Sequence, residues 1–212
     1  MKKDLTHIII VLDRSGSMSG IQQATILGFN EFIGKQRTLP GEATLLAIKF
    51  DDQYELLYEG SLAGVPPLDE NNFVPRGMTA LQDAIGRTID EAGRRLAATS
   101  EDQRPEKVVF MILTDGLENA SREYSHDKVA EMIRHQREKY SWEFIFLGAN
   151  QDAVLIGGGL NIPQQASMTY AASPAAMASV MDSVGQLTAQ YRAGKPAAFT
   201  EEQREAAMTG KA

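Results

Sequence analysis

The sequence has no cysteine among its 212 residues. This absence excludes disulfides, thiolate metal sites and a cysteine nucleophile, and the chain does not require an oxidising compartment. A long hydrophobic run is also missing near the amino terminus, where the apolar stretch of residues 8–12 is far too short for a signal-peptide core or a membrane span. We therefore expect a cytoplasmic protein without a membrane partner.

Positive charge is scarce as well. The chain has 21 Lys and Arg residues against 28 Asp and Glu residues, a formal net charge of −7 and a pI near 5.1. Nucleic-acid binding requires Lys and Arg clustered on one face. The one basic stretch, residues 134–139, includes Glu138 and indicates a solvated helix face. We therefore expect no nucleic-acid partner.

The length of the chain fits one large domain with a full core. We expect this domain to span residues 1–193 and to be followed by a flexible C-terminal tail over residues 194–212. Thr200 and Gln203 are spaced to cap a short helix in that tail. The segment has little apolar surface, however, so we expect the tail not to dock.

Apolar runs and helically spaced apolar residues alternate along the chain. This alternation is typical of an α/β fold with a doubly wound, mostly parallel sheet and helices on both faces. The runs at residues 43–50 and 54–59 are too close for a crossover helix, so they predict a hairpin whose second strand is an antiparallel edge strand. The other expected strands are residues 8–12, 107–114, 143–147 and 167–171, and the main expected helices lie around residues 21–35, 81–96, 129–133 and 177–191.

Oxygen-bearing side chains follow or precede these elements at the same end. Asp13, Ser15 and Ser17 come directly after the first strand, Thr79 precedes the second long helix, and Asp115 follows a central strand. In a doubly wound sheet such ends meet at the topological switch point, where ligands bind. Each residue alone is an ordinary turn or capping residue. Together, as oxygen ligands without His or Cys, they suit a hard cation such as Mg²⁺.

This set of residues resembles the von Willebrand factor type A (VWA) domain with a complete metal-ion-dependent adhesion site, in particular its stand-alone bacterial members. The resemblance covers about residues 4–192 and implies a Rossmann-like sheet. It also implies that Asp13, both serines and Thr79 hold Mg²⁺ or Mn²⁺, with Asp115 often acting through a water. The segments that carry the resemblance are Asp13-Arg14-Ser15-Gly16-Ser17, Gly77-Met78-Thr79-Ala80-Leu81 and Leu113-Thr114-Asp115-Gly116.

Such a site leaves room for an outside ligand. Mg²⁺ prefers octahedral geometry, and an ion that Asp115 holds only through water is under-neutralised and attracts an anionic oxygen. The resemblance implies that a Glu or Asp of a partner protein supplies this oxygen, and it suggests an ATPase, a kinase or a stress-response protein as the partner. We expect the surrounding surface to set specificity, namely Arg14, Met18 and residues 69–76 and 117–122.

Two other uses of the same residues are open. A metal-dependent phosphoester hydrolase needs a general base near the metal-bound water. The three histidines do not lie in the motif segments, because His7 precedes the expected first strand, His126 begins a helix and His135 lies on a helix face. A structural ion clip is the third use, but three neutral hydroxyls make a weak, open site that suits exchangeable coordination better. We expect a non-catalytic, metal-dependent protein-binding module.

Overall fold

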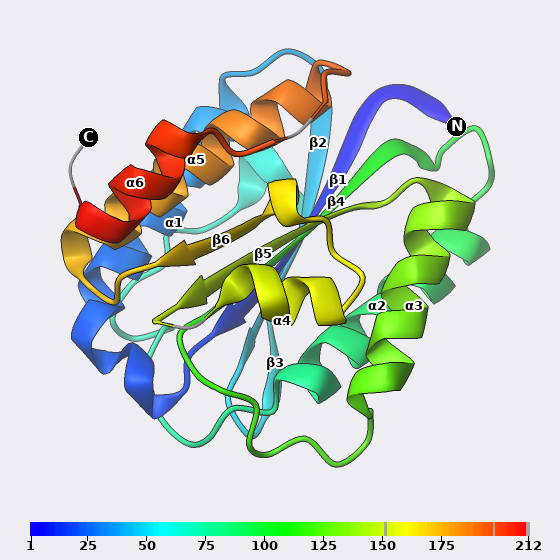
Figure 1. Cartoon of the computed structure of the whole chain (residues 1–212). Helices are drawn as coiled ribbons and strands as arrows, with labels where there is room; N and C mark the ends of the chain where they lie inside the picture. The colour runs from blue at the N-terminus through cyan, green and yellow to red at the C-terminus, as the bar shows by residue number, and fades with distance from the viewer. Residues whose placement is uncertain (151, 197, 211–212) are drawn as a thin grey trace.

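The computed structural model describes residues 1–150, 152–196 and 198–210, and a six-stranded sheet forms its centre (Figure 1). The strands lie in the order β3-β2-β1-β4-β5-β6. β2 and β3 pair antiparallel, whereas the other neighbouring strands pair parallel, which confirms the predicted sheet with one antiparallel edge strand. The strands are β1 (Lys2–Asp13), β2 (Glu42–Phe50), β3 (Tyr54–Ser61), β4 (Pro105–Thr114), β5 (Glu143–Ala149) and β6 (Ser167–Tyr170).

Helices cover both faces of the sheet, as the sequence predicts (Figure 1). Successive side chains of a strand point to opposite faces, so Ile8 and Ile10 belong to one hydrophobic core while Ile9 and Val11 belong to the other. The helices over the first core are α1 (Gln22–Arg37), α5 (Pro174–Arg192) and α6 (Glu201–Thr209), and those over the second are α2 (Leu81–Ala98), α3 (His126–Tyr140) and α4 (Ala153–Gly159).

The order of the strands places the switch point between β1 and β4. The chain leaves β1 toward β2 on one side and leaves β4 toward β5 on the other. Leu12 pairs with Leu113 in the parallel register of these two strands, so Asp13 and Thr114 end neighbouring strands at the same edge. The carboxyl ends of β1 and β4 therefore bring the residues that follow them together.

β1 begins earlier than its apolar run. The sequence places His7 before the strand, but the strand starts at Lys2, and His7 is half-buried within it with a ring nitrogen 2.7 Å from Thr44 Oγ1. Leu5 pairs with Glu42 of β2, and Thr6 pairs with Lys107 of β4. The strand therefore extends toward the amino terminus beyond its apolar run, because β2 pairs with it from Leu5 onward and β4 from Thr6 onward.

The predicted flexible tail over residues 194–212 is wrong for its helical part. Residues Glu201–Thr209 form α6, which has the expected capping box between Thr200 and Gln203. Ala207 is fully buried and its carbonyl accepts a hydrogen bond from Ala171 N (3.1 Å). Arg204 donates to the carbonyls of Ser167 (2.6 Å) and Gln164 (2.9 Å). The Arg204 side chain, one main-chain hydrogen bond and one small buried side chain thus dock a helix that has little apolar surface.

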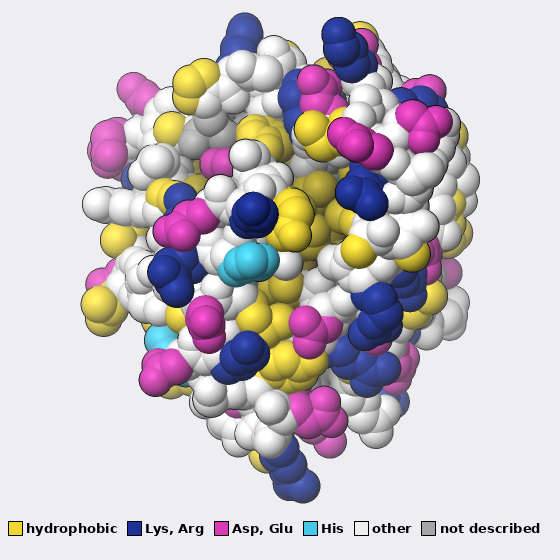
Figure 2. All heavy atoms as spheres, turned by 90° about the vertical axis from the view of Figure 1, so that its right-hand side faces the viewer, with side chains coloured by type: hydrophobic (Ala, Val, Ile, Leu, Met, Phe, Trp, Pro, Cys, Tyr) yellow, Lys and Arg dark blue, Asp and Glu magenta, His cyan; other side chains and the backbone are white. Residues whose placement is uncertain are grey.

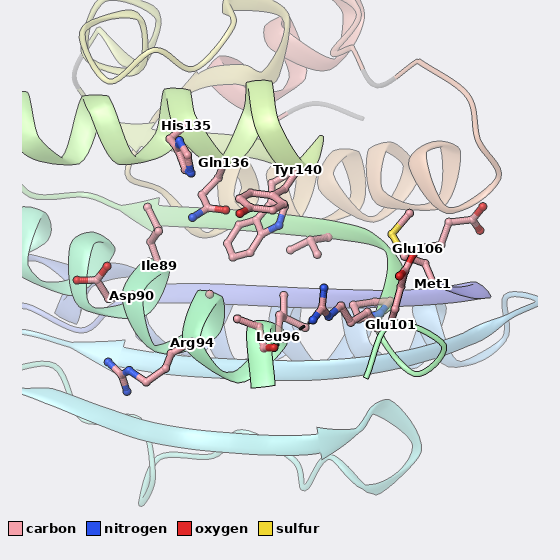
Figure 3. Close-up of a pocket in the computed structure, with 16 residues that line it drawn as sticks. Met1, Ile89, Asp90, Arg94, Leu96, Glu101, Glu106, His135, Gln136 and Tyr140 are labelled. Carbon is pink, nitrogen blue, oxygen red and sulfur yellow. Dashed lines mark hydrogen bonds between the residues drawn. The ribbon is translucent and has the colours of Figure 1, made fainter. Parts of the chain in front are cut away.

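A groove of about 480 Å³ opens between α2 and α3, at the edge of the sheet opposite the carboxyl ends of β1 and β4. Figure 2 shows apolar side chains on its floor and charged side chains along its sides. Ile89 and Leu96 of α2 face Gln136 and Tyr140 of α3 across it (Figure 3). Within the described residues, the helices are all too short or too polar to cross a membrane.

Candidate metal centre

Asp13 ends β1 with a fully buried side chain. Its Oδ1 accepts a hydrogen bond from Ser15 N (2.6 Å) and its Oδ2 accepts one from Thr114 Oγ1 (2.6 Å). Burial raises the pKa of Asp13 to about 6, although these hydrogen bonds act in the opposite direction and lower it. No cationic side chain in the described part of the chain forms an ion pair with Asp13 or Asp115. The buried carboxylate therefore lacks a counter-charge.

The two serines link Asp13 to the second carboxylate. Ser15 Oγ lies 3.0 Å from Ser17 Oγ, and Ser17 Oγ donates a hydrogen bond to Asp115 Oδ1 (2.6 Å). Burial raises the pKa of the half-buried Asp115, and the Ser17 hydroxyl lowers it. The charge of Asp115 in turn raises the pKa of Asp13. The two carboxylates thus repel each other across a row of hydroxyls.

Thr79 reaches the same place from the segment before α2. A methyl group built on Gly116 would lie 2.6 Å from Thr79 Oγ1 and 3.4 Å from Ser15 Oγ, so Gly116 leaves both hydroxyls uncovered. Asn119 holds Thr79 in position, because Thr79 N donates to Asn119 Oδ1 (2.9 Å) and Asn119 N donates to the Thr79 carbonyl (3.0 Å).

Main-chain hydrogen bonds fasten the Thr79 segment to the loop after β1. Gly16 N donates to the carbonyl of Gly77 (3.2 Å), and Arg76 N donates to the carbonyl of Arg14 (2.8 Å). Gly77 has a φ of +68°, and a side chain there would collide with Asp52 Oδ1. A glycine at this position therefore allows the Thr79 segment to pack closely against the turn between β2 and β3.

Arg14 and Met18 do not belong to the surface around the site, contrary to the prediction. Met18 is fully buried in the core beside α1, and Arg14 is 3 % exposed. The Arg14 guanidinium pairs with the buried Asp51 (Nε to Oδ2, 3.2 Å) and with Glu55 (Nη2 to Oε1, 2.5 Å). Arg76 adds a second bond to Asp51 Oδ2 (2.9 Å). Because both acidic partners lie far along the chain, Arg14 braces the β1 loop against the β2–β3 hairpin.

The structure brings all five predicted residues, Asp13, Ser15, Ser17, Thr79 and Asp115, to one point at the carboxyl edge of the sheet. That they hold an ion stays a prediction. Sequence reasoning missed Thr114 and Asn119, which orient Asp13 and Thr79. Thr114 lies next to Asp115 in a quoted motif, which was a usable signal, whereas no local pattern points to Asn119.

No family model matches the sequence, and a search of curated proteins finds no significant match. Solved structures do match in fold. A von Willebrand factor type A protein from Catenulispora acidiphila has 17 % identity over 87 % of this chain and 42 % of that chain, with a TM-score of 0.57. The vWF domain of the type V pili tip protein Mfa5 from Porphyromonas gingivalis has 12 % identity over 93 % of this chain and 98 % of that chain, with a TM-score of 0.61.

A third match is proximal thread matrix protein 1 from the mussel byssus, solved with a zinc-occupied MIDAS motif. It has 16 % identity over 87 % of this chain and 46 % of that chain, with a TM-score of 0.62. The chain has the von Willebrand factor type A fold. It spans less than half the length of the mussel protein, so this likeness concerns the VWA fold alone.

The donor set of this VWA fold fits a divalent cation. Two carboxylates and three hydroxyls face one point, the inner carboxylate is buried without a counter-charge, and Gly116 keeps the space between the hydroxyls open. Among the described residues no group of three or more His, Asp or Glu side chains gathers as a metal site. A site with two carboxylates and mainly neutral oxygens suits Mg²⁺ or Mn²⁺ better than a soft metal.

The three histidines of this VWA fold are not part of the five-residue set. His7 contacts Thr44 within the sheet, and His135 packs its ring against Tyr140 on α3, beside the groove at the opposite edge of the sheet. His126 contacts its neighbour Asp127 (3.4 Å) and lines a different cavity, between the start of α2 and α4. Within the five residues, Asp13 and Asp115 are the side chains that can act as a general base.

Proposed function

We propose that this VWA domain is a non-catalytic module that binds Mg²⁺ or Mn²⁺ and engages an acidic side chain of a partner protein through it. The ion would be held by Asp13, Ser15, Ser17 and Thr79, with Asp115 hydrogen-bonded behind Ser17. The observation that carries the proposal is the buried Asp13 carboxylate, which lacks a cationic partner among the described residues. The zinc-occupied MIDAS of the mussel protein supports a divalent ion.

The residues of this chain explain why an outside carboxylate fits. Neutral hydroxyls contribute no charge, so one buried carboxylate leaves a divalent ion with a net positive charge toward solvent. When bound, the ion supplies a Lewis-acid position for an anionic oxygen. Asp115 accepts a hydrogen bond from Ser17 Oγ, and the resemblance implies that it would act on the ion through a water. An Asp or Glu of the partner completes the charge balance.

The kind of partner also belongs to this proposal. The resemblance to stand-alone bacterial VWA proteins suggests a cytoplasmic partner, namely an ATPase, a kinase or a stress-response protein. The absence of cysteine agrees with a cytoplasmic location.

A peptide library with a fixed central Asp tests the carboxylate contact. We expect the protein to retain this library in Mg²⁺ and to release it in EDTA, and not to retain a matched library with a central Asn. Asp13→Asn keeps the size of the side chain but removes its charge, so it should abolish retention. Asp102→Asn changes an exposed carboxylate in the loop before β4 and should retain peptides as wild type does. Equal retention of the Asp and Asn libraries would contradict the proposal.

Phosphatase activity distinguishes the alternative use of the site. We expect no turnover of p-nitrophenyl phosphate with Mg²⁺ or Mn²⁺. Turnover by the wild type that disappears in Asp13→Asn would instead support a metal-dependent phosphoester hydrolase.

A further inference from the structure

A second cavity adjoins the proposed metal site. It has a volume of about 560 Å³ and lies between the start of α2, the segment after β4 and helix α4. Leu117 and Leu155, two of its lining residues, are 67 % and 72 % exposed. They are the two most exposed large apolar side chains in the described part of the chain. Two such leucines beside one cavity are typical of a binding surface rather than of scattered surface residues.

Chain connectivity places the wall of the cavity close to the proposed metal site. Leu117 follows Asp115 by two residues, and Leu81 follows Thr79 by two residues. Two residues span at most about 7 Å of chain. Two separate segments that carry proposed metal ligands therefore also supply lining residues of the cavity, within the reach of a few residues of an extended peptide.

The wall of the cavity is ordered in advance by two carboxylates. Glu118 accepts hydrogen bonds from Gln82 N (2.9 Å) and from Ser121 N (2.7 Å). Asp83 accepts hydrogen bonds from the main-chain N–H groups of Arg122, Glu123 and Tyr124. These bonds tie the segment after β4 to the start of α2. A preformed wall lowers the entropic cost of binding a peptide.

We propose that this cavity binds the part of the partner segment that flanks its metal-bound carboxylate. A large apolar side chain, one to three residues from the Asp or Glu, packs between Leu117 and Leu155. The inference rests on the function proposed above and adds to it the chemistry of the partner: an acidic residue with a Leu, Ile, Met or Phe close by in an extended chain.

The same central-Asp library tests this inference when the retained peptides are sequenced. We expect the Mg²⁺-retained peptides to be enriched in Leu, Ile, Met or Phe at one to three positions from the Asp. One enriched sequence is then synthesised and its Kd measured by fluorescence anisotropy in Mg²⁺. The Leu117→Ser, Leu155→Ser double variant should bind this peptide about ten-fold more weakly, because the loss of an apolar contact of this size raises the Kd by about a factor of ten.

A matched variant separates a contact in the cavity from a general surface effect. Leu27→Ser, at a leucine of α1 that is 61 % exposed and lines neither the groove nor this cavity, should change neither the unfolding temperature nor the Kd of the peptide. Equal weakening of peptide binding by Leu27→Ser and by the double leucine variant would contradict a specific role of the cavity.

The outcomes distinguish the two proposals. Mg²⁺-dependent retention of Asp peptides without apolar enrichment, together with unchanged affinity in the leucine variants, would overturn the cavity inference and leave the proposed function standing. The absence of Mg²⁺-dependent preference for Asp over Asn would overturn both. Apolar enrichment that the leucine variants abolish, while Mg²⁺-dependent retention of Asp persists, would support both.

Discussion

At the scale of single residues, Gly116 keeps the space between the Thr79 and Ser15 hydroxyls open. We predict that Gly116→Ala weakens or abolishes stabilisation by Mg²⁺, because the added methyl group would lie 2.6 Å from Thr79 Oγ1. The matched control is Gly158→Ala in α4, where an added methyl group meets no atom within 4 Å. This control should keep the Mg²⁺ response and gain up to about 1 kcal/mol of stability. Thermal unfolding with Mg²⁺ and with EDTA measures both.

His7 makes the stability of the protein depend on pH. Burial lowers the pKa of His7 to about 4, below its usual 6.5. Between these values the folded state binds fewer protons than the unfolded state, so the His7 contribution is complete above pH 6.5 and is lost as the pH falls toward 4. We predict a loss of about 2 kcal/mol in the free energy of unfolding between pH 7.5 and pH 5.

Urea unfolding of wild type and His7→Gln at the two pH values checks this prediction. The difference between the two proteins isolates His7. Asp13, whose pKa is raised to about 6, acts in the opposite direction, since its protonation at lower pH favours the folded state in the absence of metal. Parallel pH profiles for wild type and variant would show that His7 does not titrate differently on folding.

At the scale of elements, α6 depends on its docking. A helix of nine residues is unstable alone in water. We predict that Ala207→Glu, which places a carboxylate at a fully buried position, detaches the helix and speeds amide hydrogen exchange over residues 201–209. Met208→Glu changes the next residue, which is 51 % exposed, and should leave the exchange unchanged. Equal exchange in the two variants would mean that α6 is not held by this contact.

At the scale of the whole molecule, ion binding should appear as a gain in stability that grows with concentration. Above its Kd, each ten-fold increase in Mg²⁺ adds about 1.4 kcal/mol to a protein that binds it only when folded. For a chain of this size that gain corresponds to about 3–6 °C in unfolding temperature.

General screening of the net charge of −7 must be separated from ion binding. Sodium chloride at matched ionic strength serves as the salt control, and Asp13→Asn serves as the site control. Scanning fluorimetry of wild type and variant over a series of Mg²⁺ concentrations gives the increase in unfolding temperature with Mg²⁺. An increase in the unfolding temperature of Asp13→Asn as large as that of wild type would place the effect outside the proposed site.

The sequence by itself determined the sheet and the five candidate ligands. One apolar run ends at Asp13 and another ends just before Asp115. Each run predicts a strand, and the Asp that follows it predicts a site residue at the end of that strand. The rule that parallel strands end at one edge then joins these segments with Thr79 without any knowledge of distant contacts. The hairpin of β2 and β3 followed equally from its short connection.

Only the tertiary structure decided which residues support the site and what lies beside it. Arg14 is buried because Asp51 and Glu55 meet it from the β2–β3 hairpin, and Asn119 matters because its side chain reaches Thr79. The docking of α6 rests on hydrogen bonds from the Arg204 side chain and on one main-chain hydrogen bond, all to distant segments. Such contacts join residues tens of positions apart and depend on burial, which no local spacing of residue types encodes.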